Sequence, residues 1–148
     1  MTELVGESAT LDYAGKFASL CRPPLIIHLQ GDLGSGKTTF ARGFISALGH
    51  AGNVKSPTFT LVESYELNSV RLFHFDLYRL NDPQELEYIG VRELEGEQDV
   101  ICLIEWPEKG GQAVPASDLL FQLEYHGDSR SVESYAKSPI GQKIIDNL

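Results

Sequence analysis

The sequence predicts an α/β fold with a mixed, mostly parallel central sheet flanked by helices. Short runs rich in branched and aromatic residues, typical of strands, alternate with segments whose apolar residues recur at helical spacing. One run, VICLIEW at 100–106, is apolar almost throughout, which is typical of a strand buried on both faces of a parallel sheet. Strands that alternate with helices favour a parallel sheet covered by those helices.

The first third of the chain contains two predicted helices on either side of one strand. The segment 7–21, ESATLDYAGKFASLC, predicts a helix that RPP ends. LIIHLQ at 25–30 follows as a strand, and KTTFARGFISALG at 37–49 predicts the second helix, with Gly49 as its C-terminal cap. One stripe of the first helix carries its apolar residues, Leu11, Ala14, Phe17, Ala18 and Cys21.

The remaining elements are shorter. FTLVESY (59–65) and VRLFHFDLY (70–78) are β-rich runs around LNS, which predicts a hairpin and makes the sheet mixed. DPQELEYIGVREL (82–94) opens with an N-cap aspartate and a proline at the first helical position, and Gly90 is placed to interrupt or end that helix. Besides the strand at 100–106, we expect a strand at 118–125 and a short helix at 141–148.

Length and composition favour one cytoplasmic domain spanning residues 1–148. No run approaches the roughly 18 consecutive apolar residues of a membrane span, and the N-terminus has neither a basic start nor an apolar signal core. We therefore expect no membrane association. Cys21 and Cys102 lie in apolar surroundings without ligand-like spacing, which predicts buried, reduced thiols rather than a disulfide or a zinc site.

The formal net charge of −9 is unevenly distributed. Residues 82–108 carry nine acids and one base, whereas residues 1–81 carry seven of each and residues 109–148 carry five acids and four bases. Nucleic-acid binding relies on lysine and arginine, so a direct grip on RNA or DNA is disfavoured. A basic partner protein suits the acidic block better, and a solvated helix face is the plainer interpretation.

The segment between the strand at 25–30 and the helix at 37–49 has the pattern of a P-loop. Gly31, Gly36, Lys37 and Thr38 match a glycine, four residues, then glycine, lysine and serine or threonine. The glycines let backbone N–H groups converge on an anion at the positive end of a helix. Lys37 can then reach the β- and γ-phosphates, the Thr38 hydroxyl can ligate Mg²⁺, and Thr39 is placed for the α-phosphate. The pattern predicts a P-loop NTPase-like fold, since a simple glycine turn gives no reason for the lysine.

Two acids are candidates for the opposite side of such a site. In an open parallel sheet, ligands sit beyond the carboxyl edge of the strands. Glu105 directly follows VICLI, where a carboxylate can hold magnesium or order an attacking water. Asp76 lies in the apolar run RLFHFDLY, where an unpaired charge is costly, and the alternative for Asp76 is an ion pair with Arg79.

The loop KSPTFTLVESY, after the second helix, is rich in hydroxyls. Ser56 and Thr58 could form a switch that senses the γ-phosphate, and a capping turn accounts for them about as well. We interpret Trp106 and His74 as packed aromatic residues rather than catalysts.

Several of these segments together resemble a known family. SATLDYAGKFA, LQGDLGSGKTTFARGF, SPTFTLV, HFDLYRL and IEWPE, in this order, resemble the TsaE (YjeE) family, the small bacterial ATPase of tRNA threonylcarbamoyladenosine biosynthesis. The P-loop alone is generic, whereas the last three segments in sequence are specific. The resemblance covers most of the chain and thins beyond about residue 112.

The resemblance implies ATP hydrolysis, with ATP and Mg²⁺ as cofactors, that supports threonylcarbamoyl transfer to adenosine 37 of tRNA. A TsaD-type subunit paired with a TsaB-type subunit performs the transfer, and the ATPase docks on that pair. The chain then meets tRNA only indirectly, through the complex, which suits its acidic composition.

The resemblance also implies roles for individual residues. Thr38 and Glu105 look like the magnesium ligands, and Asp76, Glu105 and Lys37 like the catalytic residues. Ser56 and Thr58 look like the switch loop, and Trp106 is a family hallmark without an evident role. The positions that resemble nucleotide-binding residues are Thr10, Asp32, Leu33, Gly34, Ser35, Gly36, Lys37, Thr38, Thr39 and Arg130.

Three other functions compete with this one. A GTPase lacks support because no Asn-Lys-x-Asp guanine signature occurs. A small-molecule P-loop kinase needs a second substrate pocket and commonly an arginine-bearing lid, and no compact arginine cluster is present. The third is a nucleotide-gated protein-binding module, in which ATP orders residues 55–62 and hydrolysis is incidental. For the ATPase we expect slow hydrolysis by the isolated chain, completed by its partner.

Overall fold

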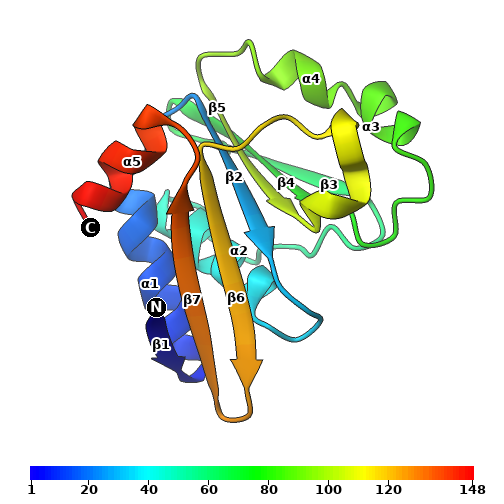
Figure 1. Ribbon diagram of the computed structural model, residues 1–148. Coiled ribbons are helices and arrows are strands. Elements are labelled where there is room, and N and C mark those ends of the chain that lie inside the picture. The colour runs from blue at the N-terminus through cyan, green and yellow to red at the C-terminus, as the bar shows by residue number, and fades with distance from the viewer.

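The computed structural model describes residues 1–148 and contains one seven-stranded sheet (Figure 1). The strand order is β1-β7-β6-β2-β5-β4-β3. The four central strands β6, β2, β5 and β4 are parallel, and β7, β1 and β3 pair antiparallel at the margins. The prediction of a mixed, mostly parallel sheet is confirmed. The strands are β1 (Thr2–Val5), β2 (Leu25–Gln30), β3 (Val62–Leu67), β4 (Val70–Asp76), β5 (Val100–Glu105), β6 (Leu119–His126) and β7 (Ser129–Ala136).

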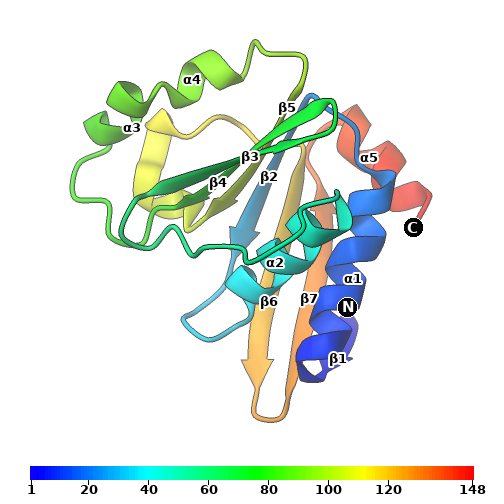
Figure 2. The same cartoon turned by 180° about the vertical axis from the view of Figure 1, so that it is seen from behind.

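Helices cover the sheet unequally. The helices α1 (Gly6–Leu20) and α2 (Lys37–Ala47) pack against one face (Figure 2). The other face is covered over β4 and β5 by α3 (Gln84–Ile89), α4 (Val91–Leu94) and the 3₁₀ segment η1 (Pro107–Ala113). The last helix, α5 (Pro139–Asp146), packs beside β7. No helix combines the length and the apolar character needed to cross a membrane.

Two apolar clusters form the core, one on each face of the sheet. On the α1 and α2 side, Phe17 and Phe40 both pack against Phe121, with ring centroids 4.5 and 4.8 Å apart. The cluster on the other face joins β4 and β5 to α3, α4 and η1. All six residues of β5 are buried, as its apolar run predicted, because this strand lies between the two clusters.

The predicted elements are present, with shifted ends. The N-cap of α3 is Pro83 rather than the predicted Asp82, because the helix begins at Gln84, one residue later than expected. The Asp82 carboxylate still accepts a hydrogen bond from the Gln84 backbone N–H at 3.0 Å. Gly90, at φ +84°, separates α3 from α4. The strand β3 begins at Val62, three residues later than predicted, and α5 begins at Pro139, two residues earlier.

Three elements escaped the sequence analysis: β1, β7 and η1. The strand β7 carries mostly polar residues and is defined by its antiparallel pairing with β6 rather than by an apolar pattern. The four-residue β1 is held in turn by β7. These strands form because they pair with other strands, and the local sequence pattern does not reveal that pairing.

Candidate functional site

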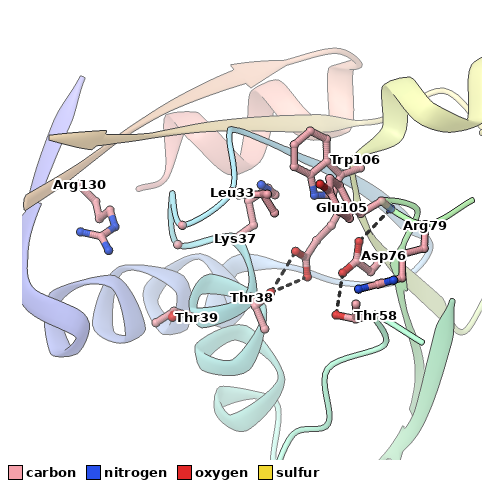
Figure 3. Close-up of a pocket in the computed structure, with 13 residues that line it drawn as sticks. Leu33, Lys37, Thr38, Thr39, Thr58, Asp76, Arg79, Glu105, Trp106 and Arg130 are labelled. Atoms are coloured by element: carbon pink, nitrogen blue, oxygen red, sulfur yellow. Dashed lines mark hydrogen bonds between the residues drawn. The ribbon is translucent and has the colours of Figure 1, made fainter. Parts of the chain in front are cut away.

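A cavity of about 630 Å³ opens at the carboxyl ends of β2, β4 and β5 (Figure 3). Asp76 ends β4 and Glu105 ends β5, and these two residues are register partners across the parallel pair. The loop after β2 forms the opposite wall. The lining residues are Leu33, Gly34, Gly36, Lys37, Thr38, Thr39, Thr58, Asp76, Tyr78, Arg79, Glu105, Trp106 and Arg130.

Glycines fix the path of the loop between β2 and α2. Gly31 has φ +150°, and a Cβ there would lie 2.4 Å from the Leu123 carbonyl oxygen. Gly36 precedes α2 in the left-handed region, at φ +104°. Both conformations favour glycine, so the loop can approach β6 closely and deliver its backbone to the N-terminus of α2.

Lys37 lies at the base of this cavity and is only 5% exposed. Its ammonium donates to the carbonyl oxygens of Gly31 and Asp32 and lies 4.2 Å from the centroid of the Trp106 ring. Burial lowers the pKa of Lys37, and the nearby carboxylates, Glu105 foremost, oppose that shift. No carboxylate forms an ion pair with this ammonium, so the cation remains available to an anionic ligand.

Thr38 and Glu105 meet across the cavity. The Thr38 hydroxyl donates to the Glu105 carboxylate, with distances of 3.2 Å to Oε1 and 3.4 Å to Oε2 (Figure 3). One hydroxyl and one carboxylate fit Mg²⁺, which usually takes one or two protein ligands and completes its shell with water and substrate phosphates. No group of three or more His, Cys, Asp or Glu side chains forms a metal site elsewhere.

Asp76 is only 6% exposed. Its carboxylate accepts from the Tyr78 backbone N–H at 3.1 Å and from the Thr58 hydroxyl at 3.3 Å. Burial raises the pKa of Asp76, the Tyr78 hydrogen bond opposes that rise, and the charge of Glu105 adds to it. The alternative pairing with Arg79 is absent, because that guanidinium lies 4.7 Å from the Phe59 ring centroid and forms no ion pair.

The hydroxyl-rich loop reaches the site through Thr58. The Ser56 hydroxyl lies 2.7 Å from that of Thr58, which in turn contacts Asp76. Ser56 itself is exposed and does not line the cavity. The chain from Ser56 through Thr58 therefore connects the solvent-facing loop to a buried carboxylate.

Thr10 and Arg130 lie close to the P-loop although both are distant from it in sequence. They line a smaller adjoining cavity of about 130 Å³, which shares Gly36, Thr39 and Arg130 with the main one. Thr10 comes from the first half of α1 and Arg130 from β7, where its guanidinium stacks 4.3 Å from the Tyr125 ring centroid. The fold thus extends the P-loop pocket towards α1 and β7.

Two predicted P-loop positions do not line the main cavity. Asp32 is exposed, and its backbone carbonyl contacts the Lys37 ammonium. Ser35 is buried, and its hydroxyl has no partner. These residues shape the loop from outside the cavity.

The sequence analysis missed one polar contact and two lining residues. His74 is fully buried, as predicted, but its Nε2 lies 2.6 Å from Glu105 Oε2. It shares a face of β4 with Asp76, two positions along, and that spacing is the signal that could have shown its connection to the site. Tyr78 lines the cavity beside Trp106, with ring centroids 5.0 Å apart, and Arg79 lines it near Asp76.

Comparison with known proteins identifies the family. The profile described as "Threonylcarbamoyl adenosine biosynthesis protein TsaE" matches residues 4–132 of this chain. The chain belongs to the TsaE family. A TsaE of Haemophilus influenzae is 45% identical over 144 residues, which cover 94% of this chain and 90% of that protein. The Bacillus subtilis TsaE is 39% identical over 111 residues, covering 75% of this chain and 68% of that protein. Both are named "tRNA threonylcarbamoyladenosine biosynthesis protein TsaE".

A solved structure agrees with this assignment. The crystal structure of Bacillus subtilis YdiB superposes with a TM-score of 0.82 at 28% sequence identity, covering 99% of this chain and 90% of that one. The resemblance to the TsaE family and the P-loop NTPase-like fold are both confirmed. The match at this length includes β7, the strand that brings Arg130 to the TsaE pocket.

Proposed function

We propose that this TsaE-family chain is a Mg²⁺-dependent P-loop ATPase domain, residues 1–148, in the cytoplasm. Its ATP hydrolysis supports threonylcarbamoyl transfer to adenosine 37 of tRNA. The observation that carries the proposal is the meeting of Thr38 with the buried Glu105 carboxylate at the mouth of a glycine loop that also holds Lys37. A phosphate chain and its magnesium ion account for all three groups at once.

Each residue has a role in this reaction. The backbone of the loop, whose residues 33, 34 and 36–39 line the cavity, and the Lys37 ammonium bind the phosphates, and Thr38 and Glu105 would hold Mg²⁺. Bound magnesium neutralises charge that develops on the transferred phosphoryl group. Asp76 orients the attacking water, and its raised pKa suits a group that accepts a proton. Thr10 and Arg130 contact the nucleoside side of the ligand.

A TsaD-type and TsaB-type pair is the proposed partner. The Ser56 and Thr58 hydroxyls couple an exposed loop to Asp76, so docking on this loop can position the catalytic carboxylate. Hydrolysis is therefore slow in the isolated chain and faster in the complex. Because the chain carries a net charge of −9, which disfavours binding to the tRNA phosphates, the partners make the contact with tRNA.

The same loop favours one competing function, the nucleotide-gated binding module. In that case ATP binding orders residues 55–62, and cleavage is incidental. A small-molecule kinase has less support, since Arg79 and Arg130 lie at opposite ends of the cavity and do not form an arginine cluster (Figure 3).

The test is phosphate release from ATP and from GTP by the purified chain, alone and with a TsaD–TsaB-type pair. We expect ATP-selective turnover that rises with the pair and falls by about a hundredfold or more in Lys37→Ala, since this ammonium acts on the phosphates. GTP preference, or no rise with the pair, would contradict the proposal. Restored tRNA modification by a Glu105→Ala variant that binds ATP without cleaving it would favour the binding module.

A further inference from the structure

The buried contact between His74 and Glu105 is not explained by packing. His74 Nε2 lies 2.6 Å from Glu105 Oε2, and the two side chains are 0% and 2% exposed. A carboxylate oxygen only accepts, so Nε2 carries the hydrogen of this bond. Hydrogen bonds to a charged acceptor are short and strong, and here no water competes for them.

Packing alone would favour an apolar residue at this position. His74 lies between Phe73 and Phe75 in β4, and its other ring nitrogen, Nδ1, has no hydrogen-bond partner although it is buried. An unpartnered buried nitrogen is unfavourable, and a phenylalanine would avoid it. The contact of Nε2 with Glu105 is the only polar interaction that the ring makes, and it is the feature that a phenylalanine cannot supply.

The position of His74 makes the two oxygens of Glu105 unequal, because it contacts only one of them. Oε2 lies 2.6 Å from His74 Nε2 and also 3.4 Å from the Thr38 hydroxyl, whereas Oε1 contacts Thr38 alone, at 3.2 Å. His74 is the register partner of Leu103, two residues before Glu105 on the adjacent strand, so it holds the carboxylate from within the sheet. Without this contact, the terminal torsion of Glu105 is free to turn either oxygen to the cavity.

We propose that His74 is a positioning residue that locks the Glu105 carboxylate so that Oε1 is presented to the magnesium ion beside Thr38. The proposal rests on the function proposed above, since it assigns Glu105 to the metal. Partners behind a ligating carboxylate commonly set metal affinity, and their loss typically lowers it 10- to 100-fold. His74 should therefore affect the metal step while leaving metal-free nucleotide binding unchanged.

Three substitutions separate the hydrogen bond from the packing. His74→Phe keeps a ring and removes the donor. His74→Gln keeps a donor at about the reach of Nε2, and His74→Asn, the matched control, carries the same amide one carbon shorter. Trp106 is the only tryptophan in the chain and lines the cavity next to Glu105, so its fluorescence reports ligand binding without a label.

The experiment measures two affinities on the full chain. ADP is titrated in EDTA, and Mg²⁺ is then titrated into the ADP complex, both followed by Trp106 fluorescence. We expect His74→Phe and His74→Asn to weaken Mg²⁺ binding by about tenfold or more, within the usual range for such partners, with ADP affinity in EDTA unchanged. His74→Gln should recover most of the loss.

A double-mutant cycle with Glu105→Gln makes the test specific. If His74 acts through Glu105, His74→Phe has no further effect on Mg²⁺ affinity once Glu105 is replaced. The proposal is overturned if folded His74→Phe binds Mg²⁺ as tightly as the parent chain, or if its ADP affinity in EDTA falls as much as its Mg²⁺ affinity. It is also overturned if His74→Gln binds Mg²⁺ no more tightly than His74→Asn. Failure of the proposed function itself gives a different result. In that case Mg²⁺ would not change the affinity of the parent chain for ADP, and Lys37→Ala would bind ADP as tightly as the parent chain.

Discussion

Lys37, Asp76 and Glu105 are buried around the candidate site, at 5%, 6% and 1% exposure. Burial disfavours the charged form of a side chain, which explains the lowered pKa of Lys37 and the raised pKa of Asp76. A phosphate chain with magnesium brings negative charge to the lysine and positive charge to the acids. The charges of the site without ligand therefore favour the binding of a phosphate chain together with a magnesium ion.

Replacing Asp76 by asparagine should stabilise the chain without ligand. The pKa of Asp76 is raised above its ordinary value of 3.8 in the folded state, so its favourable contribution to folding is complete below that value and is lost as pH rises through the raised value. Asparagine does not titrate and can still accept from the Tyr78 N–H. Thermal unfolding between pH 3 and pH 7 should show Asp76→Asn gaining stability over the parent as pH rises.

The same variant should lose ATP hydrolysis under partner-stimulated conditions. A variant that gains stability and loses turnover identifies a residue retained for chemistry at the expense of the fold. A variant that loses stability more strongly at pH 7 than at pH 3 would contradict the assigned sign.

The two cysteines should be unreactive in the folded chain. Burial raises the pKa of Cys21 and of Cys102 to about 12, and each side chain is at most 3% exposed. The thiolate is the reactive form, so a disulfide reagent at pH 8 should modify neither thiol before unfolding and both in denaturant. Rapid modification of one thiol in the native protein would show that its cover opens locally.

At the scale of elements, two parallel strands and one close helix pair determine the site. The register of β4 and β5 aligns Asp76 with Glu105, and a one-residue shift of either strand would turn its own carboxylate to the opposite face of the sheet and separate the two. The helix α2, whose N-terminus carries Lys37 and Thr38, packs directly on α1. Packing between these helices therefore affects both stability and the placement of the P-loop.

Two helical glycines in this interface should respond oppositely to alanine. A Cβ on Gly43 would lie 2.7 Å from the Leu11 carbonyl oxygen, so Gly43→Ala forces α1 and α2 apart and should lower the free energy of unfolding by about 1–3 kcal/mol. A Cβ on Gly15 would lie 3.5 Å from Ala47 Cβ, an ordinary contact. Gly15→Ala should raise stability by about 0.5–1 kcal/mol through helix propensity. Urea unfolding of both variants measures this, and equal effects would contradict the close packing at Gly43.

At the scale of the whole molecule, charge and topology limit what the chain can bind alone. The acids of residues 82–108 lie mainly on α3, α4 and the following loop, away from the P-loop. Their burial pattern is that of a solvated surface, since eight of these nine acids are exposed or half-buried and only Glu105 is fully buried. An exposed acidic segment of this kind cannot neutralise the phosphates of a nucleic acid.

The isolated chain should bind tRNA with a dissociation constant above about 100 µM at 0.15 M salt, which is as weak as the weakest non-specific binding or weaker. A gel-shift or fluorescence-anisotropy titration with and without the TsaD–TsaB-type pair measures this. Tight binding by the chain alone, with a steep dependence on salt, would show that phosphate contacts exist on its surface and would contradict indirect contact with tRNA.

Much of the fold and the centre of the site could be predicted from sequence because they depend on local patterns. Apolar periodicity identified α1, α2, β2 and β5, and the glycine spacing identified the loop before Lys37. The contact of His74 with Glu105 was not predicted, because the spacing from Asp76 indicates only that the two residues share a face of β4, and the contact itself joins residues 31 apart through strand register. Nor could β7 be found, and with it the approach of Arg130 to Thr10.

The sequence by itself determined the class of fold, the P-loop and the kinds of side chain that a phosphate and a magnesium ion require. These features arise within a few residues of one another, where spacing and residue type suffice. Three contacts were decided only by the tertiary structure. Glu105 is the acid that accepts a hydrogen bond from Thr38, Asp76 accepts one from Thr58 instead of pairing with Arg79, and His74 contacts Glu105. Those contacts depend on strand order and register, which long-range packing fixes and local pattern leaves open.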